Sequence, residues 1–325
     1  MKYLKPSTGQ IHLYGEMHGL KSMIDKHFES WHYYYMVHGM RHMVLESSFF
    51  KAEFLNIWMH EDSDDILDAV FEDLHGTASG TVYNRELYRR IKRELPETIF
   101  HGVDVGHQHS TTGERFLQHL RTSGLEGSEL YRLAEENIEQ GREFYGLQDE
   151  GHNWRTIVMA NNFIRIFDSL GDESVMGQFG NFHVSIDETR NMTAVLKERY
   201  GENVHTTDLI KYFTIHSMGI PDVVSVGGTE FDALFYGEQD MRSFSANYVM
   251  REFWLITDEN AYDTFKDHPT TGDVLPFDNF PMLVEAGQVA VIRYIRADGT
   301  HHMEYSRSDG TIWQGMEIFS AFYIP

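Results

Sequence analysis

Short apolar segments alternate with longer amphipathic segments through the first two thirds of this sequence, and that alternation leaves few architectures open. The apolar segments suit buried strands, and the segments between them carry apolar residues at helical spacing. Strand, helix and strand in succession favour parallel pairing through right-handed crossovers. We therefore predict an α/β fold with a mainly parallel central sheet flanked by helices. The predicted strands are 11–15, 41–48, 98–103, 174–180 and 204–209.

Helical patterns fill the intervals between these strands, and some are longer than a simple crossover needs. The predicted helices are 22–38, 52–60, 64–74, 83–95, 112–121, 128–145, 152–170 and 187–200. Those within about 50–95 and 111–170 are predicted to form a helical insertion over the sheet, because ligand sites in such folds need a cover that excludes water. With the strands they make up a predicted core domain, 1–218.

The last third of the sequence has a different character. Beyond Gly219 the residues alternate in short runs, and the pairs Asp298-Gly299 and Asp309-Gly310 are typical of hairpin turns. We therefore predict that 219–325 is an antiparallel, hairpin-rich β extension packed on the core.

Charge and composition exclude several classes of function. The formal net charge of −23 repels nucleic acids and anionic lipids at long range, so neither nucleic acid nor membrane is expected as a partner. No apolar run is long enough for a membrane helix, and Met1–Pro6 lacks the apolar segment of a signal peptide, so we expect a cytoplasmic protein. The absence of cysteine excludes disulfides, thiolate metal sites and cysteine nucleophiles. The pattern specifies no oligomeric state.

Ionisable residues follow the predicted strands at the points where the strands end. Glu16 and His18 lie two residues apart, which places both side chains on one face if the backbone is still extended. Glu46, Asp104 and His183 end or follow later strands. Sites in open α/β sheets form outside the carboxyl ends of the strands, so these side chains are expected to converge.

Two kinds of chemistry fit such a set. A neutral histidine oriented by a carboxylate can act as general base on water, while a second histidine or a protonated acid donates to the leaving group. Alternatively, His18, His183 and Glu46 could hold a catalytic divalent metal with an open water position. The residues themselves leave both readings open.

Several motifs in a fixed order resemble the erythromycin esterase/ChaN-like superfamily, which includes TIKI/TraB-type proteases and Ras/Rap-cleaving toxin effector domains. These motifs are Gly15-Glu16-Met17-His18-Gly19, Met43-Val44-Leu45-Glu46, Gly102-Val103-Asp104, Arg155 with Met159-Ala160-Asn161-Asn162, and Gly180-Asn181-Phe182-His183-Val184. The resemblance covers the first two thirds of the chain. It implies an α/β fold whose site is built from the first Glu/His motif, the second-strand glutamate and a late histidine.

The resemblance also implies roles for individual residues. His18 would be the base that activates water without a metal, Glu46 would orient it or share its proton, and Glu16 and His183 would complete the site. Arg155, in the helix motif, would support the catalytic residues or contact an anion. Asp104 and His107 follow the third predicted strand, and from that position we expect them to bind substrate or support the catalytic residues. In the esterases the first motif has the form Gly-Glu-x-x-His-Gly. In this sequence one residue fewer separates Glu16 from His18. The substrate therefore does not carry over from the esterases.

The first expectation is accordingly a hydrolase that cleaves an ester or amide bond in a small-molecule or peptide substrate. A TIKI-type metal-dependent protease using the same residues is the second reading, with a divalent metal as its cofactor. A non-catalytic binder of haem or another small ligand is the third, supported by the aromatic run 31–35 and the abundant methionines. No cofactor is favoured, and haem is the least expected.

Overall fold

The structure, a computed structural model, describes residues 7–147, 151–185, 191–276, 280–313 and 315–324. The chain divides into two compact units. The first comprises Met1–His18, Ile24–His75 and Asn84–Asp208, and the second comprises Gly19–Met23, Gly76–Tyr83 and Leu209–Pro325. Each unit has its own sheet, and they are described separately below.

The first unit is built on a five-stranded sheet in which every pairing is parallel. Its strand order is β3-β2-β4-β1-β5, so β4 lies between the first two strands of the sequence. The strands are β1 (Ile11–Glu16), β2 (His42–Ser48), β3 (Ile99–Asp104), β4 (Val175–Gly180) and β5 (Val204–Asp208). This sheet confirms the predicted α/β class.

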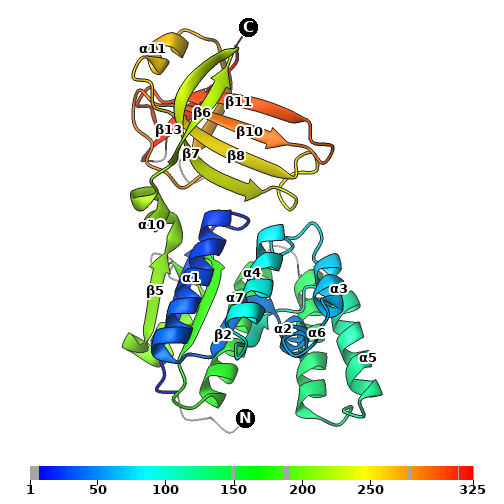
Figure 1. Cartoon of the computed structure of the whole chain (residues 1–325). Helices are drawn as coiled ribbons and strands as arrows, with labels where there is room; N and C mark the ends of the chain where they lie inside the picture. The colour runs from blue at the N-terminus through cyan, green and yellow to red at the C-terminus, as the bar shows by residue number, and fades with distance from the viewer. Residues whose placement is uncertain (1–6, 148–150, 186–190, 277–279, 314, 325) are drawn as a thin grey trace. The chain divides into compact units, whose positions relative to one another are not determined.

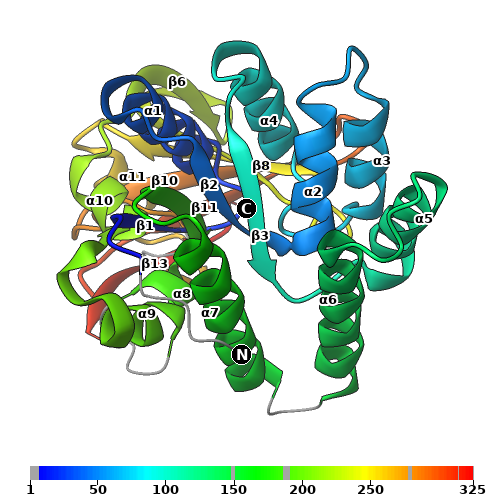
Figure 2. The ribbon, with the colours of Figure 1, turned by 90° about the horizontal axis from the view of Figure 1, so that it is seen from below.

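Helices flank the sheet on both faces and extend beyond its β3 edge. They are α1 (Lys21–His38), α2 (Phe49–Trp58), α3 (Asp65–Asp73), α4 (Val82–Glu94), α5 (Glu114–Thr122), α6 (Glu129–Gly146), α7 (Gly151–Ser169), α8 (Asn181–Val184) and α9 (Met192–Tyr200), with a π-helical turn at His109–Gly113. In Figure 2, α1 lies on one side of the parallel strands and α7, α8 and α9 lie on the other. Figure 2 places α2, α3, α5 and α6 together beyond β3, and Figure 1 also places these four helices together.

The α7 face of the sheet holds a hydrophobic core of this unit. Along β1 every second residue is buried, and Ile11 and Leu13 join this core. Met159, Phe163 and Phe167 recur at helical spacing along α7 and are also fully or almost fully buried in it. Each such side chain contributes roughly 1.5–3 kcal/mol by leaving water. The range 111–170 therefore contains both peripheral helices and a helix, α7, that is part of the sheet's own core.

The strand register brings the carboxyl ends of four neighbouring strands to one edge. Glu16 at the end of β1 is level with Gly180 at the end of β4. On the other side of β4, Leu45 pairs with Gln178, so Glu46 also reaches this edge. Ser48 in turn pairs with Asp104 at the end of β3. The fold thus gathers the ionisable strand ends that the sequence placed far apart.

The second unit contains an eight-stranded antiparallel sheet, with order β12-β13-β11-β10-β8-β7-β6 and β9 paired to β13. Its strands are β6 (Ile220–Val226), β7 (Thr229–Asp240), β8 (Met250–Ile256), β9 (Thr270–Pro276), β10 (Val289–Ile295), β11 (His301–Arg307), β12 (Ile312–Trp313) and β13 (Met316–Phe322), accompanied by α10 (Leu209–His216) and α11 (Ala261–Phe265). The predicted hairpin around Asp298-Gly299 joins β10 to β11. This region therefore forms a sheet of its own, as the hairpin-rich prediction requires.

Two details differ from the predicted elements. The helix α8 after β4 was not predicted, because four residues are too few to show a helical period. The predicted helix 187–200 corresponds to α9, and its predicted first residues, 187–190, lie outside the described residues. The signal-peptide prediction rested on Met1–Pro6, which also lie outside the described residues. Within the described residues, every helix is too short or too polar to cross a membrane.

Candidate functional site

Glu16 and His18 form the part of the site that lies at the end of β1. The Glu16 carboxylate accepts a hydrogen bond from Nδ1 of His18, and the imidazole keeps 36% of its side-chain surface exposed. A Cβ at position 180 would lie 3.1 Å from His18 Nε2, so glycine at the end of β4 leaves room for this nitrogen. His18 therefore has one nitrogen held by a carboxylate and the other at the junction of β1 and β4.

The carboxylates around His18 favour its protonated form. The charge of Glu16 is the main cause that raises the pKa of His18 to about 9, and the Glu16 hydrogen bond and the Glu46 charge act in the same direction. Burial and the positive charge of Arg155 oppose this rise. At neutral pH the imidazole is therefore mostly an imidazolium ion.

Glu46 lies at the centre of the strand ends. Its Oε2 accepts from the backbone N–H of Gly180 at 2.7 Å, which ties β2 to β4 at this edge. Its Oε1 is 2.7 Å from Nη2 of Arg155 and 3.3 Å from Nε2 of His183. Burial by itself would raise the pKa of Glu46, but His183, His18 and Arg155 outweigh it and hold this pKa well below its usual range. Glu46 is thus a fixed negative charge.

Arg155 extends from α7 and joins Glu46 to Asp104. Its Nε and Nη2 donate to the two carboxylate oxygens of Asp104 at 2.9 and 2.5 Å, a bidentate pairing. Asp104 is only 1% exposed. Burial favours its neutral form, yet the Arg155 charge and the hydrogen bonds from His107 and Arg155 lower its pKa to about 2. One buried cation therefore compensates two buried carboxylates.

His107 and His183 complete the set predicted from the sequence. His107 Nε2 is 3.2 Å from Asp104 Oδ2, so this histidine joins the network on the β3 side. His183 is buried in α8, with Nε2 facing Glu46, while its Nδ1 has no hydrogen-bond partner among the described residues. The structure therefore brings all seven predicted site residues into one series of contacts or charge interactions at the carboxyl ends of β1, β4, β2 and β3.

One contact opposes a metal ion at these residues. Among the described residues, no group of three or more histidine or acidic side chains is placed to hold one. For Glu46 to coordinate a metal through Oε1, Arg155 would have to leave that oxygen. The bond from His18 Nδ1 to Glu16 would not oppose a metal at Nε2, because metal-binding histidines commonly donate their other nitrogen to a carboxylate. The guanidinium ion already supplies the positive charge that a metal would bring.

Sequence reasoning missed two groups beside these residues. The hydroxyl of Tyr145 on α6 is 2.9 Å from His107 Nδ1, and an exposed tyrosine in a helix gives no sequence signal of such a role. Lys51 on α2 is buried; burial lowers its pKa to about 8, while the Asp104 charge opposes the change.

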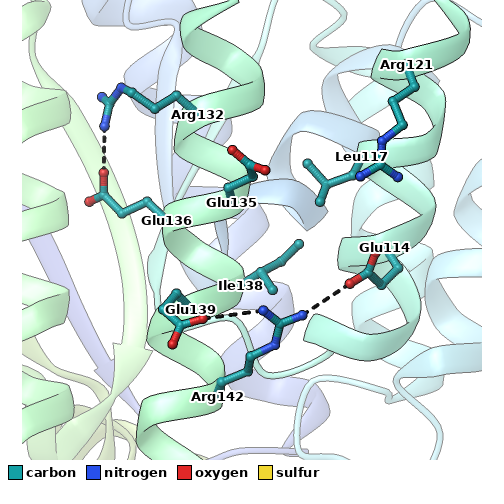
Figure 3. A pocket seen from close by; sticks show the side chains of 9 residues that line it. All are labelled: Glu114, Leu117, Arg121, Arg132, Glu135, Glu136, Ile138, Glu139 and Arg142. Carbon is teal, nitrogen blue, oxygen red and sulfur yellow. Dashed lines mark hydrogen bonds and ion pairs between the residues drawn. The ribbon is translucent and has the colours of Figure 1, made fainter. Parts of the chain in front are cut away.

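A cavity of about 640 Å³ lies away from these residues, between α5 and α6 (Figure 3). Charged side chains that already pair with one another surround it, including Arg142 with Glu114 and Glu139, at 3.3 Å each. None of the candidate site residues lines it.

Comparisons with known proteins give likenesses of shape alone. No family model and no curated protein matches this sequence. Among solved structures, a protein from Bacillus cereus aligns with a TM-score of 0.44 and 15% identity over 62% of this chain and 65% of its own, so the match spans just under two thirds of that protein. A mutant of the erythromycin esterase EreC in its open conformation aligns with a TM-score of 0.45 and 14% identity over 78% of this chain and 84% of its own. A succinoglycan biosynthesis protein aligns with a TM-score of 0.45 and 13% identity over 62% and 66%. With TM-scores below 0.5, these likenesses establish neither a shared site nor a shared substrate.

Proposed function

We propose that this protein is a hydrolase of the erythromycin esterase-like type that activates water with His18. The observation that carries the proposal is the hydrogen bond between His18 Nδ1 and the Glu16 carboxylate. In the neutral tautomer that donates Nδ1–H to this carboxylate, Nε2 holds a lone pair and can take a proton from water. The carboxylate then stabilises the imidazolium ion that forms. We accordingly assign the orienting role to Glu16.

The other residues have separable roles in this proposal. Glu46 keeps its negative charge and favours protonated His18 across the site. His183 lies behind Glu46, with its Nε2 3.3 Å from Glu46 Oε1, and helps to keep Glu46 charged. Arg155 donates a hydrogen bond to Glu46, and Asp104 in turn fixes the position of Arg155.

The raised pKa of His18 sets the pH at which such an enzyme works. A base must be unprotonated, and with a pKa of about 9 only about 1% of His18 is neutral at pH 7. Turnover should therefore increase from neutral to alkaline pH. A bound substrate that displaces water from the Glu16–His18 pair would alter the fraction of His18 that is neutral.

The substrate class that we propose is an ester or amide in a small molecule or peptide. Esters come first in a screen because their carbonyl is the more reactive toward water. The position of Arg155 disfavours the metal-dependent protease reading. Trp31 and Tyr35 of the aromatic run are buried, which leaves only part of that run for a ligand such as haem.

The test is hydrolysis of a panel of aryl esters, alkyl esters, lactones and peptides, in the presence of a chelator. We expect activity that survives chelation, that is lost in His18→Ala and that persists in the matched control His75→Ala, which removes an exposed histidine. Circular dichroism should give the same spectrum for all three proteins. Full turnover in a folded His18→Ala protein would refute the base, and activity lost on chelation and restored by a divalent metal would favour the metalloprotease.

A further inference from the structure

Helix α6 brings Tyr145 to the end of β3 through unusually close backbone packing. A Cβ on Gly141 would lie 2.1 Å from the backbone oxygen of Gly106, and a Cβ on Gly106 would lie 2.4 Å from that of Asn137. Asn137 also donates from Nδ2 to the backbone oxygen of Asp104 at 2.8 Å. Tyr145 follows Gly141 by one helical turn, so it faces the same way. Two glycines and an asparagine thus fix α6 against the turn that carries His107.

The hydrogen bonds of His107 determine which nitrogen carries the proton. Asp104 Oδ2, a carboxylate oxygen, accepts from His107 Nε2 at 3.2 Å, so Nε2 must bear hydrogen. In the neutral imidazole Nδ1 then holds a lone pair, and it accepts from the Tyr145 hydroxyl at 2.9 Å. The order is hydroxyl, imidazole, buried carboxylate. This is the order in which a hydroxyl nucleophile is activated by a base that a carboxylate orients.

We propose that Tyr145 is a nucleophile, with His107 as its base and Asp104 as the residue that positions His107, and that it reacts with activated acyl or sulfonyl groups. In the reaction the Tyr145 oxygen forms a bond to the carbonyl carbon or sulfur, and the bond from that atom to its leaving group breaks. The phenolic proton passes to His107 Nδ1 and then to solvent, and the leaving group departs with the electron pair.

Exposure and protonation both fit this role. Tyr145 is 57% exposed, so the residue lies at the protein surface, where an electrophile can approach it. Burial of the phenol oxygen and the Asp104 charge raise the pKa of Tyr145, against the opposing charge of Arg155. The phenol therefore keeps its proton at neutral pH, and reactivity depends on His107 removing it during attack.

The test is labelling of the intact chain with benzenesulfonyl fluoride, followed by peptide mapping with mass spectrometry. In this reaction the tyrosine oxygen bonds to sulfur and fluoride leaves. Tyr323 is the internal reference, because it is 51% exposed and, among the described residues, no imidazole–carboxylate pair accepts from its hydroxyl. We expect Tyr145 to be labelled at least about 100-fold faster than Tyr323, the low end of what a general base contributes.

The variant His107→Gln tests whether His107 activates Tyr145 by taking up its proton or only makes hydrogen bonds to it. The glutamine amide can accept from Tyr145 and donate to Asp104 but cannot take up a proton, so labelling should fall to the Tyr323 rate while labelling of Tyr323 stays unchanged. Tyr145→Phe should carry no adduct at this position. Equal labelling of Tyr145 and Tyr323 in the wild-type chain would overturn the proposal, whatever the variants do. Undiminished labelling in His107→Gln would overturn it as well. Neither result depends on whether the His18 site hydrolyses an ester.

Discussion

Removal of Arg155 is the change that the network at the strand ends should tolerate least. Arg155→Met keeps most of the side-chain volume but removes two hydrogen bonds to Asp104 and one to Glu46. The buried Asp104 carboxylate then loses its main cation, and Glu46 loses one of the three groups that hold its pKa down. Breaking a buried ion pair by removing one partner costs about 3–5 kcal/mol in the free energy of unfolding.

The assay is urea unfolding followed by far-ultraviolet circular dichroism, because helices α1 to α9 dominate that signal. With a urea m-value of about 2–3 kcal/mol/M, the midpoint should fall by about 1–2.5 M in Arg155→Met. The matched control is Arg142→Met, whose guanidinium also pairs with two carboxylates but is 53% exposed. Its midpoint should not move measurably, because exposed pairs contribute little.

A second substitution identifies the cause. Asp104→Asn in the Arg155→Met background removes one uncompensated charge, so it should recover part of the lost stability, although the same substitution alone should destabilise the protein. If Arg155→Met unfolds at the same urea concentration as Arg142→Met, the buried charges are not what holds these strand ends together.

Three further predictions concern α6 and the Glu16–His18 pair. Gly141→Ala should lower the free energy of unfolding by about 1–3 kcal/mol, because its methyl group meets the Gly106 carbonyl. The control Gly146→Ala has open space around the new methyl group, so it should be neutral or slightly stabilising. Thermal melts of the two variants compare their stabilities. Because the pKa of His18 rises from 6.5 to about 9 on folding, its contribution to stability should be complete below pH 6.5 and lost as pH rises through 9, which urea midpoints across this range measure. Glu16→Gln removes the main cause of that rise, so a nuclear magnetic resonance titration of His18 should show a lower pKa; an unchanged pKa would assign the shift to other groups.

The sequence predicted the element order of the first unit because its strands are short apolar runs bounded by turn residues. It also predicted which residues end those strands. It could not show that β4 separates β1 from β2, because strand order depends on how the crossovers pack and leaves no local pattern. The convergence of Glu16, Glu46 and Asp104 followed from a general property of parallel sheets and not from any single motif.

The contacts that organise the site were beyond sequence reasoning for physical reasons. Arg155 lies 51 residues from Asp104 in the sequence, and nothing in the α7 pattern indicates which carboxylates its guanidinium reaches. The pairing of Tyr145 with His107 depends on the close approach of Gly141 to Gly106, which neither glycine reveals alone.

The measurement that tests the central claim most directly is the pH dependence of kcat/KM for hydrolysis of the best ester, in wild-type protein and in Glu16→Gln. If His18 paired with Glu16 is the base, kcat/KM of the wild type should rise with pH and level off above a pKa near 9. In Glu16→Gln the same limb should move to lower pH, with a smaller maximum. A limb at the same pH in both proteins would contradict the account, because the titrating base would then not be the His18 that Glu16 holds.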